Sequence, residues 1–263
     1  LIPRSVEHLV KGEEDLLAFQ YLLVPPTAEE IDAFHKEAQD VKAFAKEHGL
    51  LVTGGWGVGL DMGSWVHGLS NLVYSVYDHP AFLRKLFTII ADWNRQRMQV
   101  VLQAGGDCYI KRDWYENTDF FTPGVWQDLI QPVLREDVRL AHQAGSKFGY
   151  IITDRAMPLL ELIAESGVDV IIGADPEAYN LDETKAQLGG RVCLWGGVNG
   201  HLTVEHGSPE AVRGEVAAAL QSLGPDGFIL SPVDNVREDT DQAMANVDTL
   251  IRTWQKLTGQ TAS

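Results

Sequence analysis

Two short segments of the sequence combine charged and aromatic side chains in a way that could support chemistry. Lys111, Asp113 and Trp114 form one segment, and Asp154 with Arg155 forms the other; each follows an apolar run. A carboxylate beside a cation could bind a substrate or transfer a proton, and neighbouring aromatic rings suit a flat or methylated ligand. A local ion pair, a helix cap or a solvated loop would account for the same residues.

Six further residues lie at or just after the ends of apolar runs: Trp56, Asp175, Trp195, Asn199, Asp234 and Asn235. The glycines around Trp56 predict either a loop that wraps a ligand or a simple turn. Asn199 could donate a hydrogen bond to a substrate carboxylate, and the Gly196-Gly197 pair before it would let the backbone approach a ligand. Asp and Asn are also frequent turn residues, and Trp195 equally suits a core position.

His67 is the best histidine candidate for acid–base chemistry, because the ordinary pKa of histidine lies near neutrality. The eight histidines include no close His-x-His or His-x-x-x-His pair, and His201 and His206, five residues apart, suit capping or solvent-exposed roles. Cys108 and Cys193 lie within apolar runs and are predicted to be core residues. The sequence therefore predicts no metal site and no disulfide, which indicates a reducing, cytoplasmic setting.

The composition narrows the expected partners. The chain has 263 residues and a formal net charge of −16. An acidic surface repels phosphate backbones and anionic lipids, so neither nucleic acid nor membrane is expected to bind. No run of 18 apolar residues is present that could span a bilayer. A small-molecule substrate is expected, and it could be anionic because a pocket can be locally basic.

Six apolar runs, each preceded by a helix-like stretch that ends near a glycine, predict parallel strands covered on both faces. They span residues 49–52, 105–110, 145–152, 167–172, 189–195 and 224–230. Alternating strands and helices indicate an α/β fold with a parallel sheet. The strands end in polar or aromatic residues, and the glycine-rich segment 54–59 lacks the spacing of a dinucleotide-binding turn. A barrel with one shared mouth is therefore favoured over an open sheet.

The predicted helices have recognisable first turns. Thr27 with Glu30 forms a capping-box pattern. Pro80, Pro123 and Pro209 occupy positions typical of the first helical residue.

A single domain is predicted over residues 1–263, with residues 1–26 as an irregular lead-in and residues 27–263 as the barrel. A closed barrel of this class has eight strands, and only six are recognised. The sequence therefore predicts a barrel that lacks the first one or two βα units at the N-terminus. Either the chain is truncated or a partner closes the barrel.

Four segments match, in order, the residue patterns of one known superfamily. They are Ala164-Glu165-Ser166-Gly167-Val168-Asp169, Gly189-Gly190-Arg191-Val192-Cys193-Leu194-Trp195-Gly196-Gly197-Val198, Gly207-Ser208-Pro209-Glu210-Ala211-Val212 and Gly227-Phe228-Ile229-Leu230-Ser231-Pro232. Together they resemble the uroporphyrinogen decarboxylase (URO-D) superfamily, which includes the corrinoid (cobalamin)-dependent methyltransferases. The resemblance runs from about Leu50 to the C-terminus and implies a (β/α)8 TIM-barrel-like fold.

The resemblance implies a methyltransferase-like enzyme that moves a methyl group from a small methylated or methoxylated compound to a corrinoid protein. Many such enzymes hold zinc through a His-x-Cys pair, whose positions fall here on Ile151 and Thr153, and neither side chain is a zinc ligand. Methyl transfer is therefore expected without that zinc site and without a tightly bound cofactor, the corrinoid being presented by the partner. Acid assistance from Asp113 or Asp154 would replace zinc. Asp234 stands where the superfamily often carries histidine.

These expectations assign a role to each candidate. The expected catalytic residues are Asp113, Asp154, Asp234 and His67, and the expected substrate-binding residues are Trp56, Lys111, Trp114, Arg155, Asp175, Trp195, Asn199 and Asn235.

Two other functions stay open. Uroporphyrinogen decarboxylase, a cofactor-free lyase of porphyrin biosynthesis, would need several arginines facing its pocket, and only Arg112 and Arg155 lie near strand ends. The missing strands and missing zinc ligands also suit a non-catalytic barrel that binds a ligand or a partner subunit. The expected partners are a small-molecule substrate, a corrinoid protein and a second copy of the chain in a homodimer.

Overall fold

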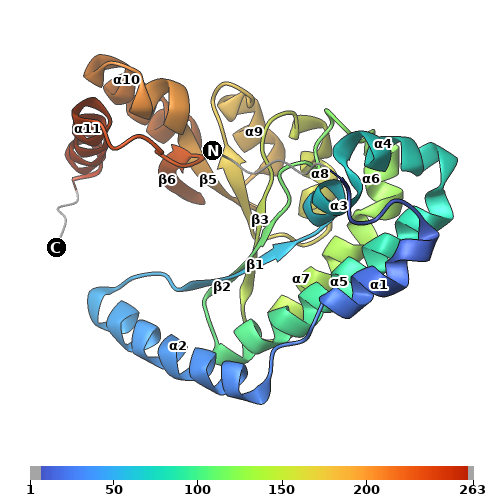
Figure 1. The fold of residues 1–263 in the computed structure, drawn as a ribbon. Helices are drawn as coiled ribbons and strands as arrows, with labels where there is room; N and C mark the ends of the chain where they lie inside the picture. The colour runs from blue at the N-terminus through green and yellow to red at the C-terminus, as the bar shows by residue number, and fades with distance from the viewer. Residues whose placement is uncertain (1–6, 260–263) are drawn as a thin grey trace. The chain divides into compact units, whose positions relative to one another are not determined.

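The computed structural model describes residues 7–259 and divides the chain into two compact units. The N-terminal unit takes the residues up to Ile151 together with Ser166–Val168, and the C-terminal unit takes Ile152–Glu165 and the residues from Asp169 onward. Each unit contains three parallel strands with helices (Figure 1). No helix within residues 7–259 is long and apolar enough to cross a membrane.

In the N-terminal unit, three strands pair in parallel: β1 (Thr53–Val58), β2 (Cys108–Arg112) and β3 (Lys147–Ile151). Its helices are η1 (Glu13–Asp15), α1 (Leu16–Leu22), α2 (Ala28–His48), α3 (Leu60–His67), α4 (Leu69–Asp78), α5 (Pro80–Ala104), α6 (Pro123–Leu129) and α7 (Gln131–Gln143). Thr53 is opposite Cys108, and Cys108 is opposite Lys147. Because the strands are parallel and in register, the residues that follow β1 and β2 lie at the same edge of the sheet.

The C-terminal unit also contains three parallel strands: β4 (Val170–Ala174), β5 (Cys193–Asn199) and β6 (Phe228–Val233). Its helices are η2 (Met157–Leu159), α8 (Leu160–Glu165), α9 (Leu181–Leu188), α10 (Pro209–Leu223) and α11 (Asp241–Thr258). A π-helical turn, η3 (Gly200–Glu205), follows β5 directly.

The predicted α/β architecture with parallel strands is confirmed. Five of the six predicted runs form strands, and the first strand, β1, begins just after the predicted run 49–52. Five of the six strands end later in the chain than predicted. Lys111 and Asn199 therefore lie inside β2 and β5 rather than after them. Within the described residues, six strands are two fewer than the eight of a closed barrel, as expected for a partial barrel. The single-domain organisation stays a prediction.

The first strand differs most from its prediction. The predicted run 49–52 precedes the strand, and the glycine-rich segment around Trp56 forms β1 itself rather than a loop. A Cβ atom at Gly54 would come within 2.7 Å of the Val101 side chain, and one at Gly55 within 2.6 Å of the Ile110 carbonyl oxygen. These glycines therefore allow close packing of β1 against α5 and β2.

The predicted helix starts are confirmed. The Thr27 hydroxyl accepts a hydrogen bond from the Glu30 backbone N at 3.3 Å, and the Glu30 carboxylate accepts from the Thr27 backbone N at 2.7 Å. Pro80, Pro123 and Pro209 lie in the first turns of α5, α6 and α10. Left-handed glycines follow α2, α5 and α9, whereas the glycine after α10 is extended.

The segment predicted as an irregular lead-in contains regular structure. Leu16–Leu22 form α1, and Val10, Leu16 and Phe19 share an apolar cluster with Phe82 of α5. Burial of these side chains attaches the lead-in to the longest helix of the N-terminal unit.

Helix α2 leaves a groove instead of burying its apolar face. Ala45 is its only buried residue, and Phe34 and Val41 stay 39% and 50% exposed. A cavity of about 840 Å³ lies between α2, α5 and β1, and Trp56 lines it.

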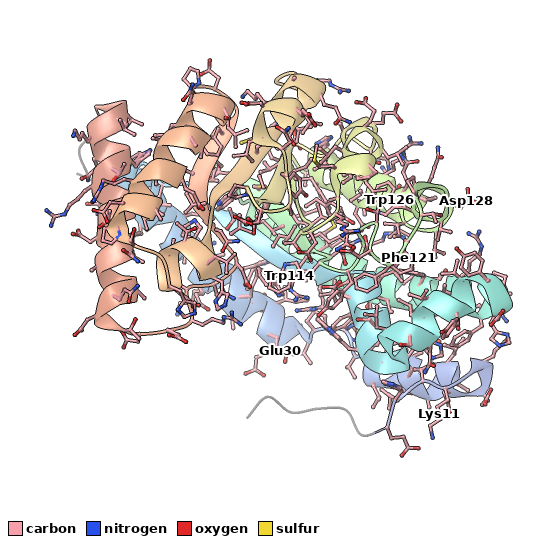
Figure 2. The ribbon with its side chains drawn as sticks, turned by 90° about the horizontal axis from the view of Figure 1, so that it is seen from above. Lys11, Glu30, Trp114, Phe121, Trp126 and Asp128 are labelled. Atoms are coloured by element: carbon pink, nitrogen blue, oxygen red, sulfur yellow. The ribbon has the colours of Figure 1, made fainter. Side chains whose placement is uncertain are left out.

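Each unit has its own apolar core. In the N-terminal unit Phe121 and Trp126, both labelled in Figure 2, are almost fully buried. In the C-terminal unit Val198 of β5 packs with residues of α10 and α11. Both cysteines are free thiols; Cys108 is buried as predicted, and Cys193 is half-buried.

Candidate functional site

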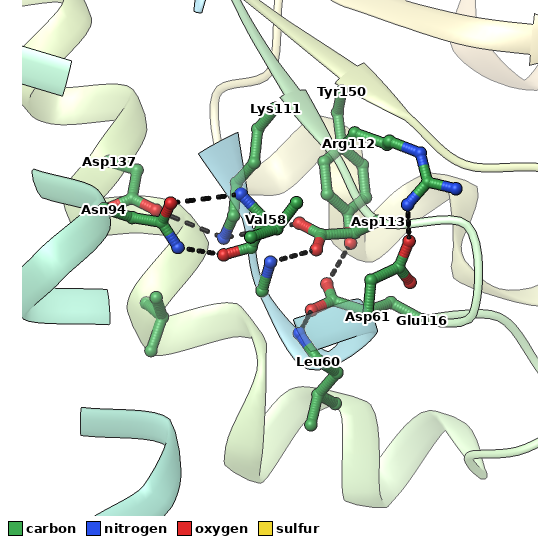
Figure 3. Close-up of polar contacts among 12 residues, drawn as sticks. Val58, Leu60, Asp61, Asn94, Lys111, Arg112, Asp113, Glu116, Asp137 and Tyr150 are labelled. Atoms are coloured by element: carbon green, nitrogen blue, oxygen red, sulfur yellow. Dashed lines mark hydrogen bonds and ion pairs between the residues drawn. The ribbon is translucent and has the colours of Figure 1, made fainter. Parts of the chain in front are cut away.

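A mostly buried polar cluster lies at the carboxyl ends of β1 and β2 in the N-terminal unit (Figure 3). Its members are Asp61, Arg95, Lys111, Arg112, Asp113, Glu116, Asp137 and Tyr150. The predicted site residues Asp113 and Lys111 belong to it, and Trp114 lies at its border. The cluster is built from β2, the loop after it, Tyr150 of β3, and the helices that follow β1 and flank the sheet.

Asp113 joins two neighbouring strand ends. It directly follows β2 and is fully buried, and its Oδ1 accepts a hydrogen bond from the backbone N of Gly59, which follows β1. A Cβ atom at Gly59 would come within 2.7 Å of Asp113 Oδ1 and 2.5 Å of Glu116 Oε1. Glycine is therefore required at this position for the loop after β2 to reach the end of β1.

Lys111 is a buried cation between two carboxylates. Its Nζ lies 3.2 Å from Asp137 Oδ2 and 3.4 Å from Asp113 Oδ2. Burial alone would lower the pKa of Lys111, but the carboxylates of Asp113 and Asp137 outweigh it and raise that pKa above the usual range. Lys111 therefore stays charged, and it is enclosed by protein groups rather than open to a substrate.

One proton balances the charge of the cluster. Its four carboxyl groups face three cations. Burial, helped by the neighbouring Glu116, raises the pKa of Asp113 well above its usual range. Burial also raises the pKa of Glu116, which accepts hydrogen bonds from the Tyr150 hydroxyl and, at 2.9 Å, from the Leu60 backbone N. We infer that Asp113 holds the proton at neutral pH.

Asp61 fixes the loop that follows β2. Its carboxylate accepts hydrogen bonds from the backbone N of Trp114 at 3.1 Å and of Tyr115 at 2.9 Å, and from Arg112 at 2.5 Å. Burial raises the pKa of Asp61 in spite of these bonds. Three donors on one buried carboxylate give Arg112 and Trp114 fixed positions.

Arg112 lies over two indole rings and forms with them what we call the arginine–tryptophan stack: Trp65, Arg112 and Trp114. Its guanidinium carbon is 4.2 Å from the Trp114 ring centre and 5.3 Å from that of Trp65. Trp65 is 49% exposed, so the stack connects the buried cluster with solvent. The buried Nε1 of Trp114 has no hydrogen-bond partner among the described residues. A flat guanidinium between aromatic rings suits recognition of a planar or oxygen-bearing ligand.

Two other predicted residues of the N-terminal unit lie outside the cluster. His67 uses both ring nitrogens, Nδ1 with the Val10 carbonyl at 2.7 Å and Nε2 with the Ser75 hydroxyl at 3.1 Å. Because a carbonyl only accepts, Nδ1 carries the proton and Nε2 accepts from Ser75, which leaves no free nitrogen for acid–base work. Trp56 is 55% exposed in the groove beside α2.

In the C-terminal unit, Asp175 and Asn199 are paired with each other. Asn199 Nδ2 donates to the Asp175 carboxylate at 2.9 and 3.1 Å. The Asn199 side-chain oxygen caps η3 by accepting from the Leu202 backbone N at 2.6 Å, and its backbone N donates to Glu215 at 2.9 Å. Asn199, at 8% exposure, therefore has little free capacity to bind a substrate carboxylate.

Trp195 is held by a neighbouring strand. Its Nε1 donates to the Ser231 hydroxyl at 3.0 Å, and its side chain is half-buried. The glycines that follow it pack against protein: a Cβ atom at Gly196 would lie 2.8 Å from the Ala174 carbonyl oxygen. The expected approach of a ligand to this backbone is thus replaced by close contact between β5 and β4.

The remaining four predicted residues lie in exposed loops of the C-terminal unit. Asp154 and Arg155 follow β3, and Asp234 and Asn235 follow β6. Asp154 and Asp234 adopt left-handed backbone conformations, with φ of 55° and 65°. Asp234 accepts a hydrogen bond from the Asn235 backbone N at 2.7 Å, and Asp154 accepts one from the Thr153 hydroxyl at 3.3 Å. Their carboxylates are open to solvent.

The residues missed from sequence are those that contact the predicted strand-end residues, namely Asp61, Glu116 and Asp137. Asp61 and Glu116 lie in the segments that follow β1 and β2, and proximity to these strand ends was their only sequence signal. Asp137 lies in the middle of α7 and contacts Lys111 only because α7 packs beside β2. At the position of the superfamily's zinc pair, Ile151 is buried and Thr153 is half-buried, and these side chains do not fit a zinc ion.

A family model described as uroporphyrinogen decarboxylase (URO-D) matches residues 19–257. The chain belongs to the uroporphyrinogen decarboxylase family. This URO-D family member has no significant match among curated proteins. The family match spans both units, from α1 to α11.

Solved structures show the same fold at low sequence identity. A methyltransferase from Methanosarcina mazei is similar with a TM-score of 0.70 and 18% identity, over 84% of this chain and 64% of the other. A B12-independent methionine synthase from Shewanella sp. W3-18-1, in complex with selenomethionine, is similar with a TM-score of 0.61 and 12% identity, over 84% of this chain and 66% of the other. A putative vitamin-B12-independent methionine synthase from Listeria monocytogenes is similar with a TM-score of 0.52 and 14% identity, over 99% of both chains. The URO-D chain thus spans slightly less than two thirds of the first two proteins, and the likeness shows the TIM-barrel-like fold.

Proposed function

We propose that this family member is methyltransferase-like and moves a methyl group from a small methylated or methoxylated compound to a corrinoid carried by a partner protein. Its likeness in fold to a protein named as a methyltransferase, and to two named as B12-independent methionine synthases, supports methyl transfer within the family, whereas the corrinoid acceptor is inferred from the superfamily resemblance alone. The reaction proceeds without zinc at the superfamily's His-x-Cys position, because Ile151 and Thr153 stand there.

The arginine–tryptophan stack is the observation that carries the proposal. Methyl transfer from a methoxylated compound breaks the bond between the methyl carbon and oxygen, and the electron pair stays on that oxygen as negative charge. A guanidinium in a fixed orientation stabilises the negative charge that develops there. Arg112 has that orientation because Asp61 binds one of its nitrogens and its guanidinium packs on two indole rings.

Asp113 has a supporting role in this scheme. The leaving oxygen finally takes a proton from solvent, whereas Asp113 keeps its own proton at neutral pH because burial raises its pKa. Its full burial places it behind the stack rather than against a substrate. We therefore assign Asp61 and Asp113 as positioning residues, and Arg112 with Trp114 as the groups that contact substrate. The partner's corrinoid would supply the nucleophile that receives the methyl group.

Decarboxylation of a porphyrinogen receives less support. Several carboxylates on one substrate need several arginines, whereas the described N-terminal cluster contains two, of which Arg112 is paired with Asp61. Arg95, its other arginine, is bound to the buried Asp137.

A non-catalytic barrel is supported by one specific observation. The carboxyl groups that follow β2 are already paired with protein groups, Asp113 with Lys111 and Glu116 with Tyr150. Both residues are at most 1% exposed. A site filled by its own side chains can bind a ligand or partner at its rim without performing a reaction. The same assay separates this function from methyl transfer.

The test measures demethylation directly. Purified protein is mixed with cob(I)alamin and with a panel of methylamines and methoxylated benzoates, and the demethylated product is followed by NMR. We expect product from at least one compound, a rate at least ~100-fold lower for Arg112→Gln, and a smaller loss for Arg112→Lys, which keeps the charge but not the plane. Arg139→Gln, on the exposed face of α7, should leave the rate unchanged.

Three results would overturn the proposal. Conversion of uroporphyrinogen to coproporphyrinogen would replace it with decarboxylation. No turnover of any compound by a folded protein that binds a corrinoid protein would favour the non-catalytic barrel. An unchanged rate in both Arg112 variants, each shown to be folded by circular dichroism, would remove the stack from the reaction.

A further inference from the structure

Three side chains that the proposed function does not use converge after β5 in the C-terminal unit. His201 and Glu205 lie in η3, and His206 follows it. Each side chain offers one ligand atom, and the three atoms all lie within 4.8 Å of one another. The two imidazole rings are close, with centres 4.6 Å apart and planes at 80°.

The π-helical turn explains why residues at this spacing meet. In an α-helix, residues five apart point to different sides, because one turn takes 3.6 residues. A π-helix bonds residues five apart, so His206 comes back over His201, with Glu205 beside them. Asn199 caps this turn at its start. The wider turn thus places two imidazoles and a carboxylate on one side.

Glu205 is held in position to act as a ligand. Its Oε1 accepts hydrogen bonds from the backbone N of Arg237 and of Glu238, the second at 3.1 Å. Its Oε2 faces the histidines, 2.7 Å from His201 Nδ1 and 3.9 Å from His206 Nε2. The hydrogen bonds from Arg237 and His201 lower the pKa of Glu205 to about 2, so it is a carboxylate at neutral pH.

Burial differs between the carboxylate and the histidines. The Glu205 side chain is 1% exposed, whereas the His201 and His206 side chains are 48% and 46% exposed. A fixed buried carboxylate below two half-exposed imidazoles leaves the outer side open to water or another ligand. Backbone donors that orient a ligating carboxylate are typical supports of metal sites.

We propose that His201, Glu205 and His206 form a binding site for a divalent transition-metal ion, with zinc as the expected occupant. Two imidazole nitrogens and one carboxylate oxygen are a donor set that zinc takes in open sites, where water fills the fourth position. With bonds of about 2.0–2.2 Å, the ligand atoms of a tetrahedral ion lie roughly 3.3–3.6 Å apart. The ion would take the place of the proton between His201 and Glu205, and His206 would move slightly inward.

One neighbouring group opposes a cation at this site. Arg237 Nη2 lies 3.3 Å from His201 Nδ1, the nitrogen that would bind the ion. The Arg237 side chain is exposed and can turn into solvent. Its positive charge should weaken metal binding, so removing it should strengthen binding. This expectation separates a metal site from an ordinary hydrogen bond between His201 and Glu205.

The site shares no residue with the proposed methyl-transfer site, because all its residues belong to the C-terminal unit and those of the arginine–tryptophan stack belong to the N-terminal unit. It replaces the solvent-exposed roles expected for His201 and His206 from sequence. It also differs from the superfamily's zinc position at Ile151 and Thr153, so zinc here would leave the zinc-free reaction scheme intact.

The test is titration calorimetry of the full chain with Zn²⁺, supported by the absorption spectrum of bound Co²⁺. We expect one ion per chain, affinity at least about tenfold weaker for His201→Ala or His206→Ala, and no binding for the double variant. Arg237→Ala should bind more tightly. His48→Ala, an exposed histidine of α2, should bind as the unmodified chain does.

Two results would overturn the site. The first is Zn²⁺ binding of equal affinity in the His201→Ala/His206→Ala double variant, which would place the ion elsewhere. The second is no stoichiometric binding by the unmodified chain, which would leave only the hydrogen bond between His201 and Glu205. Because both histidines are half-exposed, their alanine variants should fold, and circular dichroism checks this.

Discussion

The acidic residues that follow strands have opposite surroundings in the two units. In the N-terminal unit, Asp113 and Glu116 are almost fully buried and bind backbone donors and the charged Lys111. In the C-terminal unit, Asp154 and Asp234 are exposed and adopt left-handed backbone conformations. The same position at the end of a parallel strand therefore produced a structural carboxyl in one unit and an accessible one in the other.

This difference changes how strand-end carboxylates are interpreted in such barrels. Buried carboxyls with several donors hold loops in place at a high desolvation cost, and here they hold the arginine–tryptophan stack. Exposed residues in strained backbone conformations are retained more often for function than for stability. Burial and backbone conformation, not strand-end position alone, separate the two roles.

The largest effect is expected from removing the cation of the buried cluster. Lys111→Met leaves the buried carboxylate of Asp137 without this cation, and breaking a buried pair in this way costs about 3–5 kcal/mol of unfolding free energy. Urea denaturation followed by circular dichroism measures it. Lys256→Met, on the surface of α11, should change stability by less than ~0.5 kcal/mol. Equal losses in both variants would show that the cluster is not the stabilising feature.

The proton on Asp113 predicts a second effect, on pH dependence. A carboxyl whose pKa is raised in the folded state binds its proton more tightly there than in the unfolded chain. Its contribution to stability is complete below the unfolded pKa of about 3.9, and it is lost as the pH rises through the folded pKa. Asp113→Asn removes this dependence, so its stability relative to the unmodified chain should improve as the pH rises from 4 to 9. Parallel stability curves would mean that Asp113 is ionised in the folded protein.

Glu205 in the C-terminal unit should show the opposite trend. Its folded pKa of about 2 lies below the unfolded value, so its contribution is present above a pH of about 4.5 and is lost as the pH falls toward 2. Glu205→Gln should therefore be less stable than the unmodified chain at neutral pH, and the difference should shrink in acid. Denaturation of both proteins between pH 7 and 2.5 measures this. A difference that stays constant over that range would contradict the assignment.

The fold could be predicted from local sequence signals. Glycines after helices, unbroken apolar runs, and the Thr27–Glu30 capping box act between near neighbours, and each appears in the structure. The boundaries of β1 could not be predicted, because the glycines around Trp56 are explained only by the distant Val101 and Ile110 that pack against them.

The candidate site was harder to predict from sequence than the fold, because it depends on contacts between residues far apart in the chain. Asp137 has the appearance of a solvent-facing residue on a helix, and its role requires Lys111 from β2 beside it. His67 matched the profile of an acid–base residue until Val10, from the lead-in, and Ser75 were seen to use both its nitrogens. The convergence of His201 with His206 needed a π-helical turn, which spacing rules for α-helices do not anticipate.

The smallest stability effect is expected from replacing the exposed Asp234 of the C-terminal unit by glycine. Asp234 has φ of 65°, a conformation that glycine adopts without strain, and its side chain is exposed. Asp234→Gly should therefore change the unfolding free energy by less than about 1 kcal/mol. Asp154, with φ of 55°, provides a matched variant, Asp154→Gly. Denaturation and the demethylation assay are run on the same samples.

These two glycine variants separate geometry from function. If a carboxylate is retained for chemistry, activity falls while stability is kept, because only the side chain has been removed and the backbone conformation remains favourable. If both properties are kept, the left-handed conformation serves only the turn after the strand, as Asp commonly does. A stability loss above ~2 kcal/mol would instead mean that the exposed carboxylates are as structural as Asp113, and the contrast between the units would fail.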